Sequence, residues 1–284
     1  KFRENAKPLD YRRELDISRG EAAVNYKIGG QSYGRIYFVS QKTNCAVAHF
    51  TSNREFGAEF RYERENVRLE YSDGEIVMTG AFKDGIEYAG AVKIVSDGRI
   101  TASRDCLTLT GARECTVYVN ITTAYKAPVD ARKAALNAVR TAAGKNYRDI
   151  RHDSNDFFYS LMSRSQIDLT SGDYIGAAAT DERLALIRDG NKTDFNALTE
   201  LYWNFGRYLM ISSSYDCVLP ANLQGIWSGD YDTIWSADYH ININLQMNYW
   251  LTETANLPEC GDVFLRFIKF ISEFGRHTAK VQYG

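Results

Sequence analysis

Residues 240–246 combine polar and apolar side chains in strict alternation. His240, Asn242, Asn244 and Gln246 occupy the even positions, while isoleucine or leucine occupies each odd position. In an extended segment successive side chains point to opposite faces, so this pattern predicts one polar face and one apolar face. Aromatic residues flank the segment on both sides. Amide and imidazole groups beside aromatic rings are typical of a sugar-binding site, because rings cover a sugar's flat faces while polar groups bind its hydroxyls.

Three interpretations of this segment are open. A metal site is disfavoured, because Asn is a weak ligand and the sequence spacing does not bring His240 together with His152 or His277. A solvated strand face is the second interpretation. We favour the third, a substrate site, because Asn is a poor strand former. An Asn amide does not titrate, but its carbonyl oxygen can accept a hydrogen bond from a water molecule and aim that water at a carbon atom.

Such a site also needs carboxyl groups, since glycosidases normally place two of them on either side of the scissile bond. The nearby acidic residues are Asp230, Asp232, Asp238, Glu253 and Glu259. None has a sequence context that marks an acid with a raised pKa. We interpret Asp230 and Asp238 as turn residues or hydroxyl binders, and Glu253 and Glu259 as helix-end or structural groups. From chemistry alone, residues 240–246 therefore predict half of an active site.

The elements that must position these groups change character near Pro128. Before it, short alternating segments are separated by Gly-Gly and Asp-Gly turn signals, which predicts an antiparallel β-sandwich. The predicted strands are 24–28, 33–39, 45–50, 67–71, 76–78, 89–95 and 115–122.

After Pro128 the apolar spacing becomes helical. Asp130 is the predicted N-cap of a helix that ends at Gly144. Further helices are predicted at 154–163, from 180 onward, and at 193–213, 246–256 and 262–278. This pattern predicts a β-sandwich at 1–127 that is incomplete at its start, a helical linker at 128–178 and a helical domain at 179–284. The long loop 214–245 is either functional or a well-packed loop with a buried Trp.

Charge and composition exclude some functions. The 34 basic and 36 acidic side chains show no basic stripe of the kind that binds nucleic acid, and the apolar runs are too short to cross a membrane. Five cysteines, an odd number, argue against a disulfide framework and favour small buried hydrophobic residues, although a Cys106–Cys115 bridge stays open. The chain starts without Met or a secretory signal, so we expect an internal fragment of a longer protein.

Two stretches carry a resemblance to a known family. Residues 220–227, PANLQGIW, and 238–250, DYHININLQMNYW, resemble glycoside hydrolase family 95, whose main activity is α-L-fucosidase. The resemblance continues through 256–260 and extends back to 180–184, 205–214, 29–40 and 10–16. It covers nearly the whole chain, and the stretch 220–250 is its most specific part.

The resemblance implies a β-sandwich followed by a helical linker and the first helices of an (α/α)6 barrel. It implies inverting hydrolysis of fucosylated oligosaccharides or glycans, without metal or cofactor. Asn242 and Asn244 match the family's water-positioning asparagines, and His240 matches a sugar contact. Weaker candidates for the pocket wall are Trp227, Trp235 and Asn222. The family's general acid Glu and base Asp match no residue here, so we expect the isolated chain to be inactive.

Alternatives to this function stay open. An α-L-galactosidase of the same family is the nearest, because L-galactose adds one hydroxyl at C6 and apolar pockets reject an added hydroxyl only weakly. A non-catalytic carbohydrate-binding fragment is another, and the sheet at 1–126 could serve only to support the barrel. The resemblance alone suggests a secreted or periplasmic protein.

Overall fold

The computed structural model describes residues 7–83, 85–125, 130–170, 178–190, 192–230 and 232–284. The chain divides into two compact units, Lys1–Phe157 and Phe158–Gly284. None of the described helices is both long and apolar enough for a membrane span.

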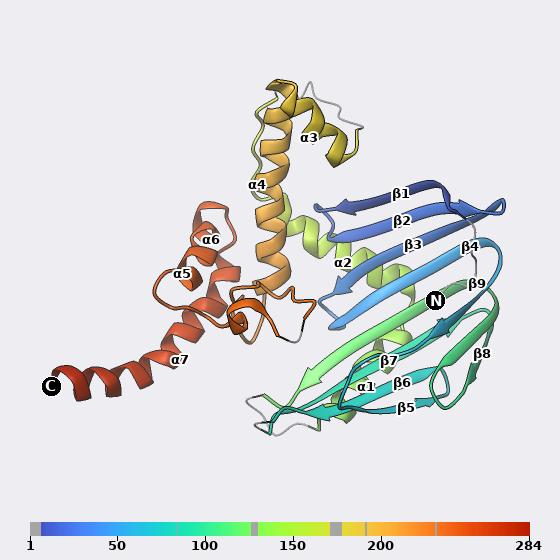
Figure 1. The fold of residues 1–284 in the computed structure, drawn as a ribbon, viewed down its shortest axis with the longest axis horizontal. Helices are drawn as coiled ribbons and strands as arrows, with labels where there is room; N and C mark the ends of the chain where they lie inside the picture. Colours follow the sequence, from blue (N-terminus) through green and yellow to red (C-terminus); the bar gives the residue numbers. More distant parts are fainter. Residues whose placement is uncertain (1–6, 84, 126–129, 171–177, 191, 231) are drawn as a thin grey trace. The chain divides into compact units, whose positions relative to one another are not determined.

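The first unit is built on one antiparallel sheet of nine strands (Figure 1). The strands are β1 (Leu9–Asp16), β2 (Glu21–Ile28), β3 (Gln31–Ser40), β4 (Cys45–Phe60), β5 (Arg68–Ser72), β6 (Glu75–Ala81), β7 (Glu87–Ser96), β8 (Arg99–Ala102) and β9 (Leu107–Thr123). Their order is β1-β2-β3-β4-β9-β7-β6-β5, and β8 pairs with β9. The predicted strands are confirmed as β2 to β7 and β9, while β1 and β8 are further strands that the alternation pattern did not indicate.

The sheet curls over its own core to form the predicted sandwich. Tyr26 and Tyr33 come from β2 and β3, whereas Ile76 and Val92 come from β6 and β7 on the far side of the strand order, yet all four belong to one buried cluster. Register shifts in the β4–β9 pair on both sides of Phe56 accompany this bend. A β-sandwich followed by helices is therefore confirmed, with its layers joined as one sheet.

Two helices follow the strands. In α1 (Ala131–Ala143) the Asp130 side chain accepts a hydrogen bond of 2.9 Å from the Lys133 amide, and Gly144 ends the helix, as predicted. Buried side chains on one side of α1, among them Ala135, Val139 and Ala142, pack in one cluster with residues of the sheet. Helix α2 (Tyr147–Met162) begins seven residues earlier than predicted, because the Asn146 side chain accepts a hydrogen bond from the Arg148 amide and caps the first turn. The predicted linker boundary at 128 lies outside the described residues, the boundary at 178 lies next to an undescribed segment, and both stay a prediction.

The second unit consists of helices and one long loop. Its elements are α3 (Thr180–Arg188), α4 (Lys192–Ser214), the 3-10 turn η1 (Ile234–Ala237), α5 (Asn244–Tyr249), α6 (Leu251–Thr254) and α7 (Pro258–Tyr283). The predicted helix at 193–213 is confirmed. The last predicted helix is longer because Pro258 occupies its first turn, where a missing amide hydrogen is tolerated. The predicted helix 246–256 forms as two short helices, α5 and α6.

A buried arginine holds this helical unit together. The Arg207 side chain on α4 is only 1% exposed. Its guanidinium donates hydrogen bonds to the carbonyl oxygens of Leu161, Met162, Ser165 and Ala255, at 2.9, 2.6, 2.9 and 3.2 Å. Two of these carbonyls belong to the last turn of α2, where helix carbonyls lack intrahelical partners. Arg207 therefore ties the end of α2 and the end of α6 to α4.

All five cysteines are free, and four of them are buried. The prediction that they act as small buried residues is confirmed for those four, and Cys106 and Cys115 form no bridge.

Candidate functional site

The loop that carries the predicted site residues is pinned at its start by a buried tyrosine. The Tyr249 hydroxyl on α5 accepts a hydrogen bond of 2.7 Å from the Ala221 amide and lies 2.9 Å from the Ser214 hydroxyl at the end of α4. Tyr249 is buried, and its ring stacks on Phe264 of α7. This network fixes where residues 220–227 leave the helical core.

Residues 220–227 lie beside residues 234–239. The Leu223 amide donates to the Asp238 carbonyl at 3.2 Å, and the Gln224 side chain donates to the Ile234 carbonyl at 3.3 Å. The Tyr239 hydroxyl donates to the Pro220 carbonyl at 3.3 Å. Two stretches separated in the sequence are thus joined into one surface.

Glycine is required at one position of this surface. Gly225 has a φ of +67°, and a Cβ atom there would lie 2.7 Å from the ring of Trp227. The Gly225 and Asn222 backbones exchange hydrogen bonds of 2.9 and 3.1 Å, which closes a tight turn. The Asn222 side-chain oxygen accepts the Gln224 amide at 2.7 Å, so this side chain supports the turn.

His240 and Trp235 are brought together. Their rings meet edge to face with centroids 5.8 Å apart and an interplanar angle of 88°. The His240 amide donates to the Asp238 carboxylate at 3.1 Å, and the imidazole contacts the same carboxylate. Trp235 is 72% exposed and Trp227 is 48% exposed, so two large ring surfaces on this loop face solvent.

The extended conformation predicted for residues 240–246 is wrong. Residues 241–243 form a turn, and α5 begins at Asn244. The Leu245 amide donates to the His240 carbonyl, and Ile241 and Ile243, predicted to share an apolar face with Leu245, are 53% and 43% exposed. No described strand pairs with this segment, so an extended form would leave its backbone amides unpaired, whereas a helical turn pairs them.

The two asparagines therefore occupy a turn and a helix start. Asn242 is exposed, and Asn244 is half-buried in the first turn of α5. On α5 the Asn248 side chain donates to the Asn222 carbonyl at 3.3 Å, which joins this helix to the 220–227 turn. The role of Asn242 and Asn244 in positioning water stays a prediction.

The carboxyl groups whose pKa is clearly shifted do not suit a general acid, which needs a raised pKa. Among the described residues each such shift is downward. Glu259 lies in the first turn of α7, where a hydrogen bond from Arg164 at 2.7 Å lowers its pKa. This agrees with the structural role that its sequence context indicates. In the part of the chain that the structure describes, no group of three His, Cys, Asp or Glu side chains could hold a metal ion.

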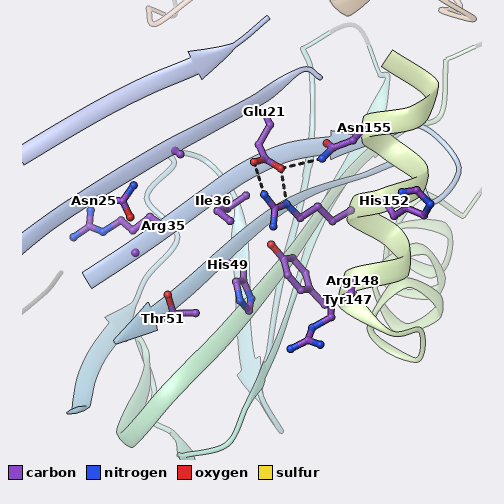
Figure 2. Close-up of a pocket in the computed structure, with 13 residues that line it drawn as sticks. Glu21, Asn25, Arg35, Ile36, His49, Thr51, Tyr147, Arg148, His152 and Asn155 are labelled. Carbon is purple, nitrogen blue, oxygen red and sulfur yellow. Dashed lines mark hydrogen bonds and ion pairs between the residues drawn. The ribbon is translucent and has the colours of Figure 1, made fainter. Parts of the chain in front are cut away.

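Sequence reasoning missed one site in the first unit. A pocket of about 660 Å³ lies between strands β2 to β4 and helix α2 (Figure 2). Its lining residues are spread from Glu21 to Asn155, and no local motif joins them. Only the pairing of distant strands, which the sequence pattern does not specify, could have revealed it.

The chain was compared with known protein families. Residues 146–284 match the family described as "Glycosyl hydrolase family 95 catalytic domain", and residues 1–128 match "Glycosyl hydrolase family 65, N-terminal domain". The chain belongs to glycoside hydrolase family 95. The matched catalytic part of this family 95 chain contains every residue that the sequence predicted for the site.

Curated relatives agree with this assignment. The family 95 chain is 27% identical over 317 residues to "Alpha-L-fucosidase 2" of Arabidopsis thaliana and 26% identical over 299 residues to "Probable alpha-fucosidase A" of Aspergillus niger. Each comparison covers 96% of this chain and 37% of the relative. A "Probable alpha-fucosidase A" of Aspergillus oryzae is 35% identical over 150 residues, which cover 51% of this chain and 20% of that protein.

Proposed function

We propose that this chain forms part of a glycoside hydrolase that releases terminal α-L-fucose from fucosylated oligosaccharides or glycans with inversion. One observation carries the proposal: residues 146–284, which include the surface built from 220–227 and 234–248, match the family 95 catalytic domain, and the relatives of this chain are named as fucosidases. The chain spans about a third of the first two of those relatives, 37% of their length. The proposal therefore concerns an enzyme that includes this chain.

In this proposal Asn242 and Asn244 hold the attacking water through their side-chain carbonyl oxygens. An amide can orient a water molecule but cannot take its proton, so a carboxylate must complete the step. His240 binds a sugar hydroxyl, and its contact with Asp238 fixes the orientation of the imidazole ring. The exposed rings of Trp227 and Trp235 cover apolar faces of the sugar.

The two catalytic carboxyl groups are assigned to parts of the enzyme outside the described residues. An inverting glycosidase needs a general acid whose pKa is raised, together with a base that activates the water. The chain spans 37% of the relatives' length, so the proposal places both groups in the remaining part of such an enzyme. The 284-residue chain alone is therefore expected to release no fucose.

The test compares two proteins on one substrate. Release of L-fucose from a 2′-fucosylated oligosaccharide is measured for the 284-residue chain and for a polypeptide of the relatives' full length that contains it. Activity of the longer protein, with inversion observed by NMR at the new anomeric centre, supports the proposal. Retention at that centre, or hydrolysis of an aryl α-L-galactoside in preference to the fucoside, would contradict it.

A further inference from the structure

The pocket in the first unit is hollowed into one face of the sheet by small residues. Strand pairing sets Asn25, Gly34 and Thr51 in one row across β2, β3 and β4, and Ala23, Ile36 and His49 in the next. Ala23 lines the pocket with a single methyl group, and a Cβ on Gly34 would lie 2.8 Å from the Thr51 hydroxyl, so glycine lets that hydroxyl lie close to the β3 backbone. At about 660 Å³, the pocket has the size of small-molecule sites.

An ion pair joins the two walls of this pocket. Arg151 on α2 donates two hydrogen bonds to the Glu21 carboxylate on β2, at 2.6 and 2.7 Å. The Asn155 amide nitrogen donates to the same carboxylate at 3.5 Å, as the dashed lines in Figure 2 show. The bidentate pair fixes helix α2 over the sheet and cancels its own charge.

Two uncharged rings form the side of the pocket nearest β4. His49 and Tyr147 stack with centroids 3.8 Å apart, and the His49 Nδ1 atom lies 2.9 Å from the Thr116 hydroxyl. Burial lowers the pKa of His49, so its ring is neutral at pH 7. Burial raises the pKa of Tyr147 to about 12, so its hydroxyl keeps its proton. Both groups therefore offer hydrogen bonds without charge.

Two buried polar atoms on α2 lack a hydrogen-bond partner among the described residues. They are the hydroxyl oxygen of Tyr147 and the side-chain carbonyl oxygen of Asn155. Both residues line the pocket (Figure 2). A buried polar atom without a partner is costly, so these atoms favour an occupant that both donates and accepts hydrogen bonds. A hydroxyl group does both, whereas a carboxylate or phosphate cannot donate to Asn155.

We propose that this pocket is a second carbohydrate site, which binds a neutral sugar unit and shares no residue with the proposed catalytic surface. Asn25, Thr51, Tyr147 and Asn155 provide uncharged hydrogen-bonding groups, and Ala23 and Ile36 provide apolar contact. Glu21 and Arg151 neutralise each other, while Arg35 and Arg148 also line the pocket and disfavour a cationic ligand. The pocket is lined only by residues of the first unit, so sugar binding there is tested independently of the proposed fucose hydrolysis.

The test is a titration of the 284-residue chain with D-galactose, D-glucose and L-fucose in turn, with D-glucuronate as the charged comparison. We expect saturable binding of at least one neutral sugar with a Kd on the order of 1 mM, together with shifts of the His49 imidazole NMR signals. Ala23→Leu fills the hollow and Asn155→Leu removes its acceptor, and each should weaken binding about tenfold or more. Ala22→Leu is the matched control, because Ala22 lies on the opposite face of β2, across from Tyr37, and should leave binding unchanged.

Several outcomes would overturn this second site. One is the absence of binding by the wild-type chain when it is folded by circular dichroism. Others are binding of glucuronate alone, or binding that His240→Ala abolishes and Ala23→Leu does not. If a variant unfolds, the His49 shifts in the wild-type protein still decide the question, since a sugar bound elsewhere would leave them unmoved.

Discussion

Replacing Arg207 should strongly destabilise the helical unit. Its guanidinium satisfies four backbone carbonyls and has no carboxylate among its hydrogen-bond partners. Arg207→Met preserves the length of the side chain but leaves those carbonyls without a donor in a buried site. Each orphaned acceptor costs roughly 1–3 kcal/mol, and part of that is offset because a charge no longer has to be buried. We therefore expect a net loss of about 3–5 kcal/mol.

The assay is urea unfolding followed by tryptophan fluorescence, to which Trp203 contributes, because the Arg207 guanidinium lies over its ring at 5.1 Å. Arg207→Lys retains a charge but cannot span four carbonyls, so it should recover less than half of the lost stability. The matched control is Arg266→Met, since the exposed Arg266 donates one hydrogen bond, to the Cys217 carbonyl, and its loss should cost less than about 1 kcal/mol. An Arg207→Met protein within about 1 kcal/mol of wild type would refute the reasoning.

Three further predictions follow from buried groups. Tyr249→Phe leaves the Ala221 amide unsatisfied and should cost about 1–3 kcal/mol in thermal unfolding; an unchanged Tm would mean that this hydroxyl does not pin the loop. Glu75 has a pKa below its ordinary value of 4.5 because Arg140 hydrogen-bonds to it, so its stabilisation is present above that value and is lost as pH falls through the lowered pKa. Glu75→Gln should therefore flatten the acid limb of the stability–pH curve, and an unaltered limb would contradict the assignment. Burial raises the pKa of Cys115 to about 12, so iodoacetamide at pH 8 should label this thiol only after the protein unfolds. Rapid labelling of Cys115 in the folded protein, detected by mass spectrometry, would contradict this prediction.

Local signals in the sequence predicted much of the fold. Turn residues between alternating segments located the strands, and the Asp130 cap and the 193–213 periodicity located helices α1 and α4. The alternation at 240–246 misled, because Leu245 is buried at a helical spacing from Tyr249, whereas Ile241 and Ile243 are exposed. Leu245 and Tyr249, four residues apart, are both buried on α5. The sequence pattern alone did not distinguish a strand repeat of two residues from a helical repeat. The segment is helical from Asn244 onward because no described strand pairs with it.

The parts that could not be predicted depend on distant pairs. Arg207 contacts carbonyls more than 40 residues away on either side, and Glu21 pairs with Arg151 across 130 residues. Neither contact leaves a local motif. The same holds for the sheet pocket, whose walls come from three strands and a helix. The candidate catalytic residues were found because they lie close together in one distinctive stretch.

The most direct test of the central proposal is L-fucose release by a full-length enzyme that contains this chain, compared with its Asn242→Ala and Asn244→Ala variants. Loss of water positioning should lower kcat on the order of 10²-fold or more with the fold intact. Asn137→Ala, at an exposed position on α1, is the matched control and should be normal. Turnover by both site variants within about twofold of wild type would contradict the proposal that these amides hold the attacking water.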